Sequence, residues 1–326
     1  MFSYFRLMVF LDVHRLVMKR NDGFAVNEIS FSQNKGEKIA IAGETGSGKT
    51  SLLKMIGGLL QPDSGEILFE GKRVEGPQER LIPGHPQIAY LSQYFELRNN
   101  YEVHELLEMA GHLDDNEVLP LFQLCRIEHL LKRKTTELSG GEKQRIVLAM
   151  QLVKKPKLLL LDEPFSNMDA IHSAEMKAVV HDVAEEKGVS VIMVSHNGKD
   201  VLPWADKIFI MQEGNFVQQG APQEIYHSPV NEYCAGLFGD YNYVSQSLFS
   251  EESKKNQKLI IRPERLHLSS TPGKGIKAIV QSVLFYGSYY HIKVKTGKSL
   301  LLVSSESGKW KKGEEVYVTH KPAVME

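Results

Sequence analysis

A glycine-rich segment near the amino terminus has the residue types needed to hold phosphate. It reads Gly43-Glu44-Thr45-Gly46-Ser47-Gly48-Lys49-Thr50 and fits the pattern G-x-x-x-x-G-K-[ST]. Its glycines let backbone N–H groups turn inward around a β-phosphate, and a helix that follows adds its positive end. Lys49 would place its charge on the β- and γ-phosphates, and the Thr50 hydroxyl would ligate Mg²⁺. This segment, extended by Ser51, therefore predicts a nucleotide site.

Two adjacent carboxylates follow a second apolar run. Leu158–Leu161 is continuously apolar and leads into Asp162, Glu163 and Pro164. The carboxyl end of a buried strand is where ligands bind in open α/β sheets. We expect Asp162 to order Mg²⁺ and Glu163 to polarise the attacking water as a general base. On its own, an Asp-Glu pair would be better explained as a solvated strand end.

Three further polar residues follow predicted strands. His196 comes after Val191–Val194 and is expected to donate to the γ-phosphate and hold Glu163 in place. Gln93 comes after Ile88–Leu91 and is placed to touch Mg²⁺ or the water. Asp169 ends the segment Ser166-Asn167-Met168-Asp169 and is expected to cross a subunit boundary. Without the phosphate segment, His196 would be a structural histidine and Gln93 a surface residue.

Alternating strands and helices would position these residues. The predicted strands are Lys38–Ala42, Ile88–Leu91, Lys157–Leu161, Ser190–Val194 and Lys207–Met211. The predicted helices are Thr50–Gly57, Gln144–Val153, His172–Glu186 and Gln223–His227. This order predicts an α/β P-loop domain with a largely parallel sheet over about residues 1–240. Residues 101–137 are helical in character, which indicates an inserted helical subdomain (about 95–150) or ordinary covering helices of the same layer.

The carboxyl-terminal part has a different pattern. Residues 241–258 are polar and are predicted to form a linker. Residues 259–326 contain short alternating runs such as Lys277–Phe285, Tyr289–Lys295 and Ser299–Val303, separated by glycine-containing turns. These runs predict a small all-β barrel.

Composition excludes several classes of protein. The 326 residues are 42% apolar and 24% charged, with a net charge of −1. The chain as a whole therefore lacks the excess of positive charge that is typical of nucleic-acid-binding proteins. Two distant cysteines, Cys125 and Cys234, indicate reduced thiols. No apolar stretch reaches the length of a membrane helix. The apolar start, residues 1–8, fits a misassigned start codon or an extra strand as well as a targeting role.

One octapeptide, Leu138-Ser-Gly-Gly-Glu-Lys-Gln-Arg145, narrows the prediction from a nucleotide-binding protein to one kind of ATPase. With the other motifs it resembles the nucleotide-binding subunit of ATP-binding-cassette (ABC) transporters. The matching motifs, in the family's order, are Gly43–Thr50 (Walker A), Gln93 (Q-loop), Leu138–Arg145 (signature), Leu158–Glu163 (Walker B), Asn167–Asp169 (D-loop) and His196 (switch).

The resemblance implies an ATPase that works as a head-to-tail homodimer. Each ATP with its Mg²⁺ would lie between Lys49 of one copy and Ser139, Gly140 and Gly141 of the other. Closing and opening of the dimer would move transmembrane permease subunits docked near Gln93. The chain would then be peripheral on the cytoplasmic face of the inner or plasma membrane, and indirectly served by an extracytoplasmic solute-binding protein.

The carboxyl-terminal part resembles a transport-associated OB-type domain. Ile261-Arg262-Pro263-Glu264 and the β-rich tail carry this resemblance, which is to importer ATPases of the maltose, polyamine and ferric-iron kind. It favours import over export. An OB-type barrel can bind nucleic acid, but this tail lacks a basic stripe interleaved with aromatics, so we expect no nucleic-acid partner. A dimerisation or regulatory module without a ligand is the alternative.

Three positions depart from the family's pattern. Glu142 stands where Gln is usual, and Asn167-Met168 stands where Ala-Leu is common. The residue that stacks on adenine is left open between Arg20 and Phe24.

Two other functions remain as alternatives. One is a soluble ABC ATPase of DNA repair or translation, which usually carries two cassettes or a long coiled coil. The other is a regulatory protein whose cassette only senses ATP. The transported solute is not specified by this sequence.

Overall fold

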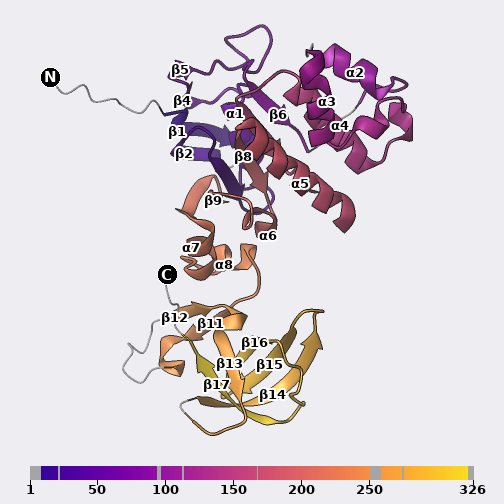
Figure 1. Cartoon of the computed structure of the whole chain (residues 1–326). Helices are drawn as coiled ribbons and strands as arrows, with labels where there is room; N and C mark the ends of the chain where they lie inside the picture. Colours follow the sequence, from indigo (N-terminus) through magenta and orange to yellow (C-terminus); the bar gives the residue numbers. More distant parts are fainter. Residues whose placement is uncertain are drawn as a thin grey trace, which may run out of the picture. The chain divides into compact units, whose positions relative to one another are not determined.

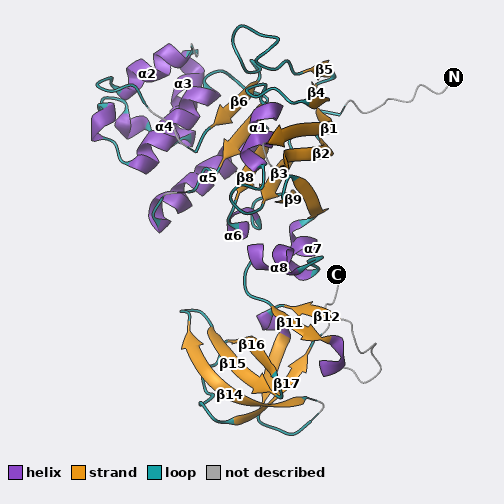
Figure 2. Ribbon diagram, turned by 180° about the vertical axis from the view of Figure 1, so that it is seen from behind, coloured by secondary structure: helices purple, strands orange, loops and turns teal. Residues whose placement is uncertain are grey.

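The computed structural model describes residues 9–20, 23–93, 97–111, 114–166, 168–249, 258–273 and 275–321. The chain divides into two compact units, Met1–Pro222 and Gln223–Glu326. The last residues of the predicted cassette, up to residue 240, therefore group with the carboxyl-terminal unit. Figures 1 and 2 show the elements of each unit from opposite sides.

A six-stranded sheet forms the centre of the first unit. Its order is β10 (Asn215–Gly220), β9 (Lys207–Gln212), β3 (Lys38–Ala42), β8 (Ser190–Ser195), β7 (Leu158–Asp162), β6 (Ile88–Leu91). All neighbours are parallel except β10 and β9. All five predicted strands are confirmed, and β7 and β8 are buried along their whole length, as expected for strands covered on both faces.

A second, antiparallel sheet was not predicted in detail. Its order is β2 (Gly23–Gln33), β1 (Leu11–Arg20), β4 (Ser64–Phe69), β5 (Lys72–Arg73). Leu11, Val13 and Leu16 of β1 are buried, and the register shifts between Val13 and Leu16, where Arg15 has a φ of 44°. This irregularity breaks the two-residue alternation by which strands are recognised in a sequence.

The helices of the first unit are α1 (Lys49–Ile56), α2 (Val103–Ala110), α3 (Asp115–Leu124), α4 (Gly140–Leu152), α5 (Ala170–Lys187) and the short α6 (Gly198–Val201), with 3-10 turns at Glu128–Leu130 and Thr135–Glu137. The three helices predicted for this unit are confirmed as α1, α4 and α5, α2 and α3 lie in the region of helical character, and α6 was not predicted. Buried side chains of α1 belong to one hydrophobic cluster with residues of both sheets, so α1 packs between them. Figure 1 shows α2 and α3 grouped with α4 beyond the edge strand β6. This packing of α2 and α3 on other helices fits an inserted subdomain.

The second unit contains the predicted β-rich domain. It begins with α7 (Pro222–His227) and α8 (Glu232–Leu237), then β11 (Asn242–Ser245), a turn at Gln246–Leu248, β12 (Lys258–Ile261) and a turn at Pro263–Arg265. Its main sheet is antiparallel, in the order β13 (Leu266–Ser269), β17 (Glu315–His320), β14 (Ile276–Phe285), β15 (Tyr290–Thr296), β16 (Ser299–Ser305). The outer strands β13 and β16 also contact each other, so the sheet curls toward a closed barrel.

The segment predicted as a linker, residues 241–258, contains ordered structure. Residues Asn242–Ser245 form β11, which pairs with β12. The Asn242 side chain is buried, donates to the carbonyls of Ile261 and Leu302, and accepts from the Leu302 amide at 2.7 Å. A polar residue here has a structural role in the domain, which composition alone does not reveal.

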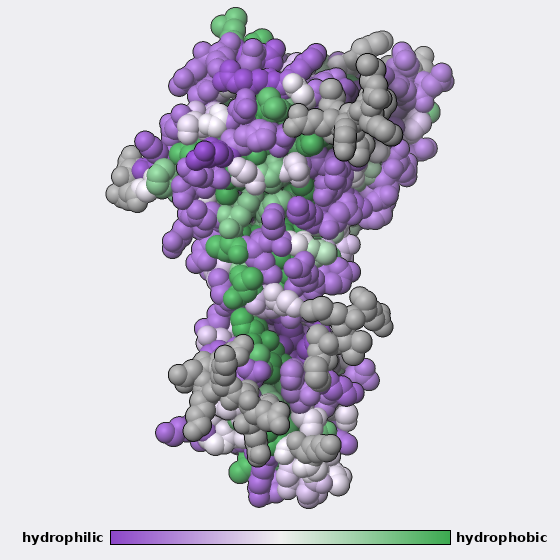
Figure 3. Space-filling model, turned by 90° about the vertical axis from the view of Figure 1, so that its left-hand side faces the viewer, coloured by the Kyte–Doolittle hydropathy of each residue, from purple (hydrophilic) through white to green (hydrophobic). Residues whose placement is uncertain are grey.

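The surface is mainly hydrophilic on the face drawn in Figure 3, with hydrophobic residues in smaller patches. Of the large hydrophobic side chains in the described part of the chain, Leu81 and Ile82 are the most exposed, at 100% and 79%. Among the described residues, the helices are too short or too polar to span a membrane.

Candidate active site

The phosphate loop connects the end of β3 to the start of α1. Its Gly46 and Gly48 have φ angles of 86° and 106°, which favour glycine. A Cβ on Gly48 would overlap the carbonyl oxygen of Ala25, and one on Gly43 would overlap that of Met211. Glycine is therefore required at Gly48 by space and by backbone conformation, and at Gly43 by space.

Lys49 is buried at the first position of α1. Its Nζ donates to the carbonyl oxygens of Gly43 at 2.6 Å and Glu44 at 2.7 Å. Burial lowers the pKa of Lys49, while Glu163 and Asp162 act in the opposite direction. An ammonium group on the loop's inner side can exchange these carbonyls for phosphate oxygens, which are stronger partners.

Thr50 and Asp162 meet at the ends of α1 and β7. Thr50 Oγ1 donates to Asp162 Oδ1 at 2.9 Å, and Asp162 is 3% exposed. One hydroxyl and one carboxylate fit Mg²⁺, which is usually held by one or two protein groups together with phosphate oxygens and waters. Among the described residues, no cluster of three or more His, Cys, Asp or Glu forms a metal site without a nucleotide.

Tyr90 is a residue of this site that the sequence analysis missed. It lies on β6 beside β7, opposite Leu160, and its hydroxyl donates to Asp162 Oδ2 at 2.6 Å. Burial and Asp162 raise the pKa of Tyr90, with Ser92 acting in the opposite direction, so the hydroxyl remains a donor. Its signal in the sequence is an aromatic hydroxyl near the end of the strand that precedes Gln93.

Glu163 and His196 form the next pair. Glu163 Oε2 and His196 Nδ1 lie 2.8 Å apart, at hydrogen-bonding distance. The backbone of Glu163 has a φ of 51° and its amide donates to the carbonyl of Val194 at 3.1 Å. Burial raises the pKa of Glu163, whereas the nearby His196 and Lys49 lower it. A carboxylate with a raised pKa and a fixed orientation suits a general base.

Gln93 reaches the same group of residues. Its Nε2 donates to Ser166 Oγ at 3.3 Å, and Ser166 Oγ donates to the carbonyl of Glu163 at 2.8 Å. The structure therefore brings together Gln93, Glu163 and His196 with Lys49, Thr50 and Asp162.

The signature residues form the start of α4. Ser139 caps the helix, and its hydroxyl accepts from the Glu142 amide at 3.3 Å. Glu142 in turn accepts from the Ser139 amide at 2.7 Å and lies 3.5 Å from Arg133. Glu142, which departs from the usual Gln, thus completes a capping box. Gly140 and Ser139 are exposed, and the amides at this helix start suit an anion.

Asp169 joins the signature through His172. Asp169 caps α5, accepts from the His172 amide at 3.0 Å and lies 2.6 Å from His172 Nδ1. These interactions with His172 lower the pKa of Asp169. A Cβ on Gly141 would lie 3.0 Å from His172, so the starts of α4 and α5 are in close contact. Asn167 lies outside the described residues.

The two candidates for stacking on adenine lie at one hairpin. Arg20 ends β1 and pairs with Gly23 of β2. Phe24 is 47% exposed and precedes Ala25, whose carbonyl lies against Gly48 of the phosphate loop. Phe24 is therefore next in the chain to a residue that contacts the loop, and the structure does not decide between the two candidates.

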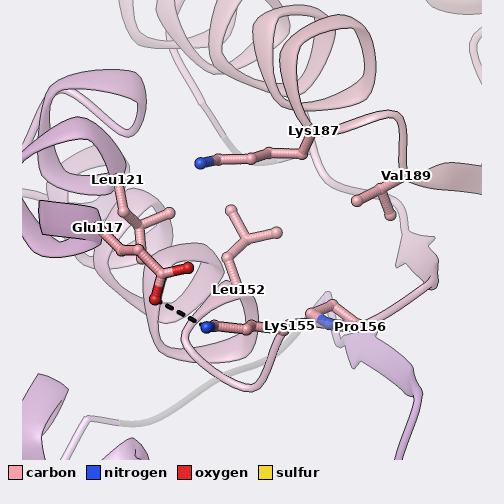
Figure 4. A pocket seen from close by; sticks show the side chains of 7 residues that line it. All are labelled: Glu117, Leu121, Leu152, Lys155, Pro156, Lys187 and Val189. Carbon is pink, nitrogen blue, oxygen red and sulfur yellow. Dashed lines mark ion pairs between the residues drawn. The ribbon is translucent and has the colours of Figure 1, made fainter. Parts of the chain in front are cut away.

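A separate pocket of about 280 Å³ lies between α3 and the carboxyl ends of α4 and α5. Figure 4 shows its lining, in which Lys155 pairs with Glu117 at 2.7 Å. It shares no lining residue with the phosphate loop, and the active site is therefore not this pocket.

Comparison with known proteins assigns two domains. The ABC transporter family model matches residues 26–166, and the TOBE domain model matches residues 259–325. The chain is 32% identical to the spermidine/putrescine import ATP-binding protein PotA of Mycoplasma mycoides, with 95% of each chain covered. It is 30% identical to the sulfate/thiosulfate import ATP-binding protein CysA of Pectobacterium atrosepticum, with 87% of each covered.

A solved structure has the same cassette fold. It is cbiO1 from Clostridium perfringens, part of the ABC transporter complex cbiONQ, with a TM-score of 0.58 and 30% identity. The alignment covers 67% of this chain and 90% of that one. The resemblance drawn from the motifs and from the β-rich tail is thus confirmed, and the chain belongs to the ABC transporter family, as an ATP-hydrolysing subunit with a carboxyl-terminal TOBE domain.

Proposed function

We propose that this protein is the MgATP-hydrolysing subunit of an ABC importer and that it acts as a homodimer. The observation that carries the proposal is the arrangement of its site residues in two groups. Lys49, Thr50, Asp162, Glu163 and His196 form a hydrolytic group without the signature residues. Ser139, Gly140 and Gly141 form the start of another helix, at which Ser139 and Gly140 are exposed.

Within the hydrolytic group, each residue has a separate task. Lys49 exchanges its carbonyl partners for β- and γ-phosphate oxygens. Thr50 and Asp162 hold Mg²⁺, which neutralises developing phosphate charge when bound. Glu163 accepts the proton of the attacking water. His196 holds the Glu163 carboxylate by its Nδ1 and leaves its second ring nitrogen to face the phosphate.

The second copy supplies the other half of each reaction chamber. The Ser139 hydroxyl and the amides at the start of α4 would hold the γ-phosphate bound by the first copy. Asp169 lies beside Gly141 through His172 and would lie at the subunit boundary. Loss of the γ-phosphate removes this grip, so hydrolysis opens the dimer.

A groove next to the hydrolytic group is a docking surface for the permease. It has a volume of about 550 Å³. It is lined by residues of the 80–90 segment, by Leu59, by Gln151 of α4 and by Lys154 just after α4. The fully exposed Leu81 and the exposed Ile82 lie in the same segment. Exposed apolar residues beside a groove mark an interaction site, and we propose that a short cytoplasmic helix of the permease occupies it.

Import is favoured by the relatives that cover both domains. PotA and CysA are both named import ATP-binding proteins, and both match through the carboxyl-terminal part. Their solutes differ, so we assign no solute to this chain. The protein would lie on the cytoplasmic face of the membrane with its permease, and a solute-binding protein outside would deliver the solute. The net charge of −1 offers no support for a nucleic-acid partner.

Reconstitution tests this function. The chain and the permease encoded with it are placed in proteoliposomes, with MgATP on the side of the ATPase. ATP-dependent movement of solute toward that side is the expected result, and Ser139→Ala should reduce it without changing the oligomeric state of the nucleotide-free protein. A chain that hydrolyses ATP at a concentration-independent specific rate in dilute solution, without any permease, would contradict the homodimer and favour a soluble or regulatory ATPase.

A further inference from the structure

Tyr90 is the residue whose position links the hydrolytic group to the groove. Its hydroxyl donates to Asp162 Oδ2 at 2.6 Å, and Tyr90 is one of the residues that line the groove. The groove is also lined by Leu59, Ile82 and Gln151. A single half-buried side chain therefore touches both a buried carboxylate and an open surface.

The carboxylate of Asp162 is held from both sides. Thr50 Oγ1 donates to Oδ1 at 2.9 Å, and Tyr90 donates to Oδ2. If Thr50 turned its hydroxyl to Mg²⁺, the hydrogen bond from Tyr90 would still orient the Asp162 carboxylate. Partners that orient a metal-binding carboxylate typically change metal affinity 10- to 100-fold when they are removed.

The backbone around Tyr90 also restricts how the hydroxyl can move. Tyr90 pairs with Leu160 in the parallel ladder of β6 and β7, and Leu91 pairs with Leu161 next to Asp162. The backbone of both strands is fixed by these hydrogen bonds. A groove occupant that displaced the Tyr90 ring would therefore move the side chain rather than the backbone, and with it the hydrogen bond to Asp162.

We propose that Tyr90 is a positioning residue that fixes Asp162 for Mg²⁺ and carries occupancy of the groove to that carboxylate. The second half of this proposal rests on the groove being the permease docking surface. In the full transporter, docking of the permease would change the affinity of the ATPase for the divalent cation through the Tyr90 ring. The Tyr90 side chain would thus couple the cation site to the docking surface.

Tyr90→Phe is the variant that tests the first half, because it keeps the ring and removes the hydroxyl. Binding of Mn²⁺ with a non-hydrolysable ATP analogue is followed by electron paramagnetic resonance, which does not depend on turnover. We expect affinity for Mn²⁺ to fall about tenfold. We also expect the half-saturating Mg²⁺ concentration for ATP hydrolysis to rise by a larger factor than kcat falls.

Tyr226→Phe is the matched control, because Tyr226 also donates to a carboxylate, Glu264, at 2.9 Å in the other unit. It should leave Mn²⁺ binding unchanged. Equal Mn²⁺ affinity of Tyr90→Phe and the unaltered protein would overturn the positioning role. An unaltered protein that fails to hydrolyse MgATP would instead overturn the proposed function, so the two failures are distinguishable.

The full transporter tests the second half. The Mn²⁺ affinity of the isolated ATPase is compared with that of the ATPase bound to its permease in detergent or nanodiscs. We expect binding of the permease to shift the affinity in the unaltered protein and to leave it unshifted in Tyr90→Phe. The same shift in both proteins would show that Tyr90 does not carry the coupling.

Discussion

The Glu163 carboxylate lies 2.8 Å from Nδ1 of His196. Both side chains leave the sheet at neighbouring strand ends, since Glu163 follows β7 and His196 follows β8. The Glu163 amide is also bonded to Val194 of β8, so the backbone and the side chain of the base are fixed by the same neighbouring strand. This placement supports the proposed role of His196 in orienting Glu163.

Glu163→Gln should abolish turnover while it preserves nucleotide binding. The amide retains the size of the carboxylate and a hydrogen-bonding oxygen for His196, but it cannot accept the proton of the attacking water. We expect kcat to fall about 100-fold or more. We also expect a stable dimer of the variant to accumulate in the presence of MgATP. Steady-state ATPase assays and light scattering measure the two effects. Glu186→Gln on the exposed end of α5 is the control, and a monomeric Glu163→Gln protein in excess MgATP would contradict both the base and the shared site.

Lys49→Ala should weaken the binding of nucleotide itself. The substitution removes the only positive side chain of the loop Gly43–Thr50 and two charge-assisted bonds that hold the loop. Hydrogen bonds to charged groups are worth about 1.5–3 kcal/mol each, so affinity should fall at least about tenfold. A fluorescent ATP analogue reports the affinity. Lys54→Ala in the last turn of α1 is the control, and full ATPase activity of Lys49→Ala would exclude the phosphate loop as the nucleotide site.

The sequence indicates which residues come together beside the phosphate loop, because these residues follow strong local patterns. Gly43–Thr50 has fixed spacing, and Asp162 and His196 each end a buried apolar run. Parallel strands bring their carboxyl ends to one edge, so strand order in the sequence leads directly to a site. β1 and β2 were missed for the opposite reason, since the register shifts in their pairing near Arg15 break the alternation.

Other roles depend on contacts between distant residues and leave no local pattern. Tyr90 has its proposed role of positioning Asp162 because β6 lies beside β7. The spacing of residues in the sequence does not reveal that these two strands are neighbours. Glu142 departs from the usual residue, yet the capping box with Ser139 explains it. Asn242 looks like a linker residue until the bonds to Ile261 and Leu302 are seen.

Gly141→Ala and Gly140→Ala should differ in stability. A Cβ on Gly141 would lie 3.0 Å from His172, whose ring is held by Asp169, whereas a Cβ on Gly140 would meet nothing within 4 Å. Overpacking costs about 1–3 kcal/mol, so Gly141→Ala should lower the free energy of unfolding by about 1 kcal/mol or more. Gly140→Ala should be neutral or slightly stabilising, because Ala favours a helix over Gly. Urea unfolding measures both, and equal stability of the two variants would contradict the packing of α4 on α5.

The two cysteines should be unreactive in the folded protein. Burial raises the pKa of Cys125 to about 12 and raises that of Cys234, and both side chains are fully buried. The thiolate is the reactive form, and its fraction grows only as the pH rises toward the pKa. A disulfide reagent at pH 8 should therefore label neither thiol in the native protein and both in urea. Rapid labelling of the native protein would show that one cysteine is accessible.

Arg262→Met should destabilise the carboxyl-terminal unit. The Arg262 guanidinium is 2% exposed and donates to the carbonyl oxygens of Tyr226, Ala235, Gly239 and Asp240 at 2.9–3.1 Å. It also lies 4.2 Å from the centre of the Tyr226 ring. Methionine fills much of the same space and removes the Arg262 donor from the carbonyls of Tyr226, Gly239 and Asp240, whereas the Ala235 carbonyl still accepts from the Phe238 amide. Each unsatisfied buried group costs about 1–3 kcal/mol.

The expected loss for Arg262→Met is therefore about 3 kcal/mol or more, with the effect on the unfolding of residues 223–326. Calorimetry of the full chain resolves it if the two units unfold separately, and hydrogen exchange of α8 and β12 resolves it otherwise. Arg265→Met, three residues along the chain, is the control, because among the described residues its side chain has no hydrogen-bond or ion-pair partner. If the two variants have equal stability, the carbonyls around Arg262 are satisfied by water, and the arginine does not hold α7 and α8 onto the β-rich domain.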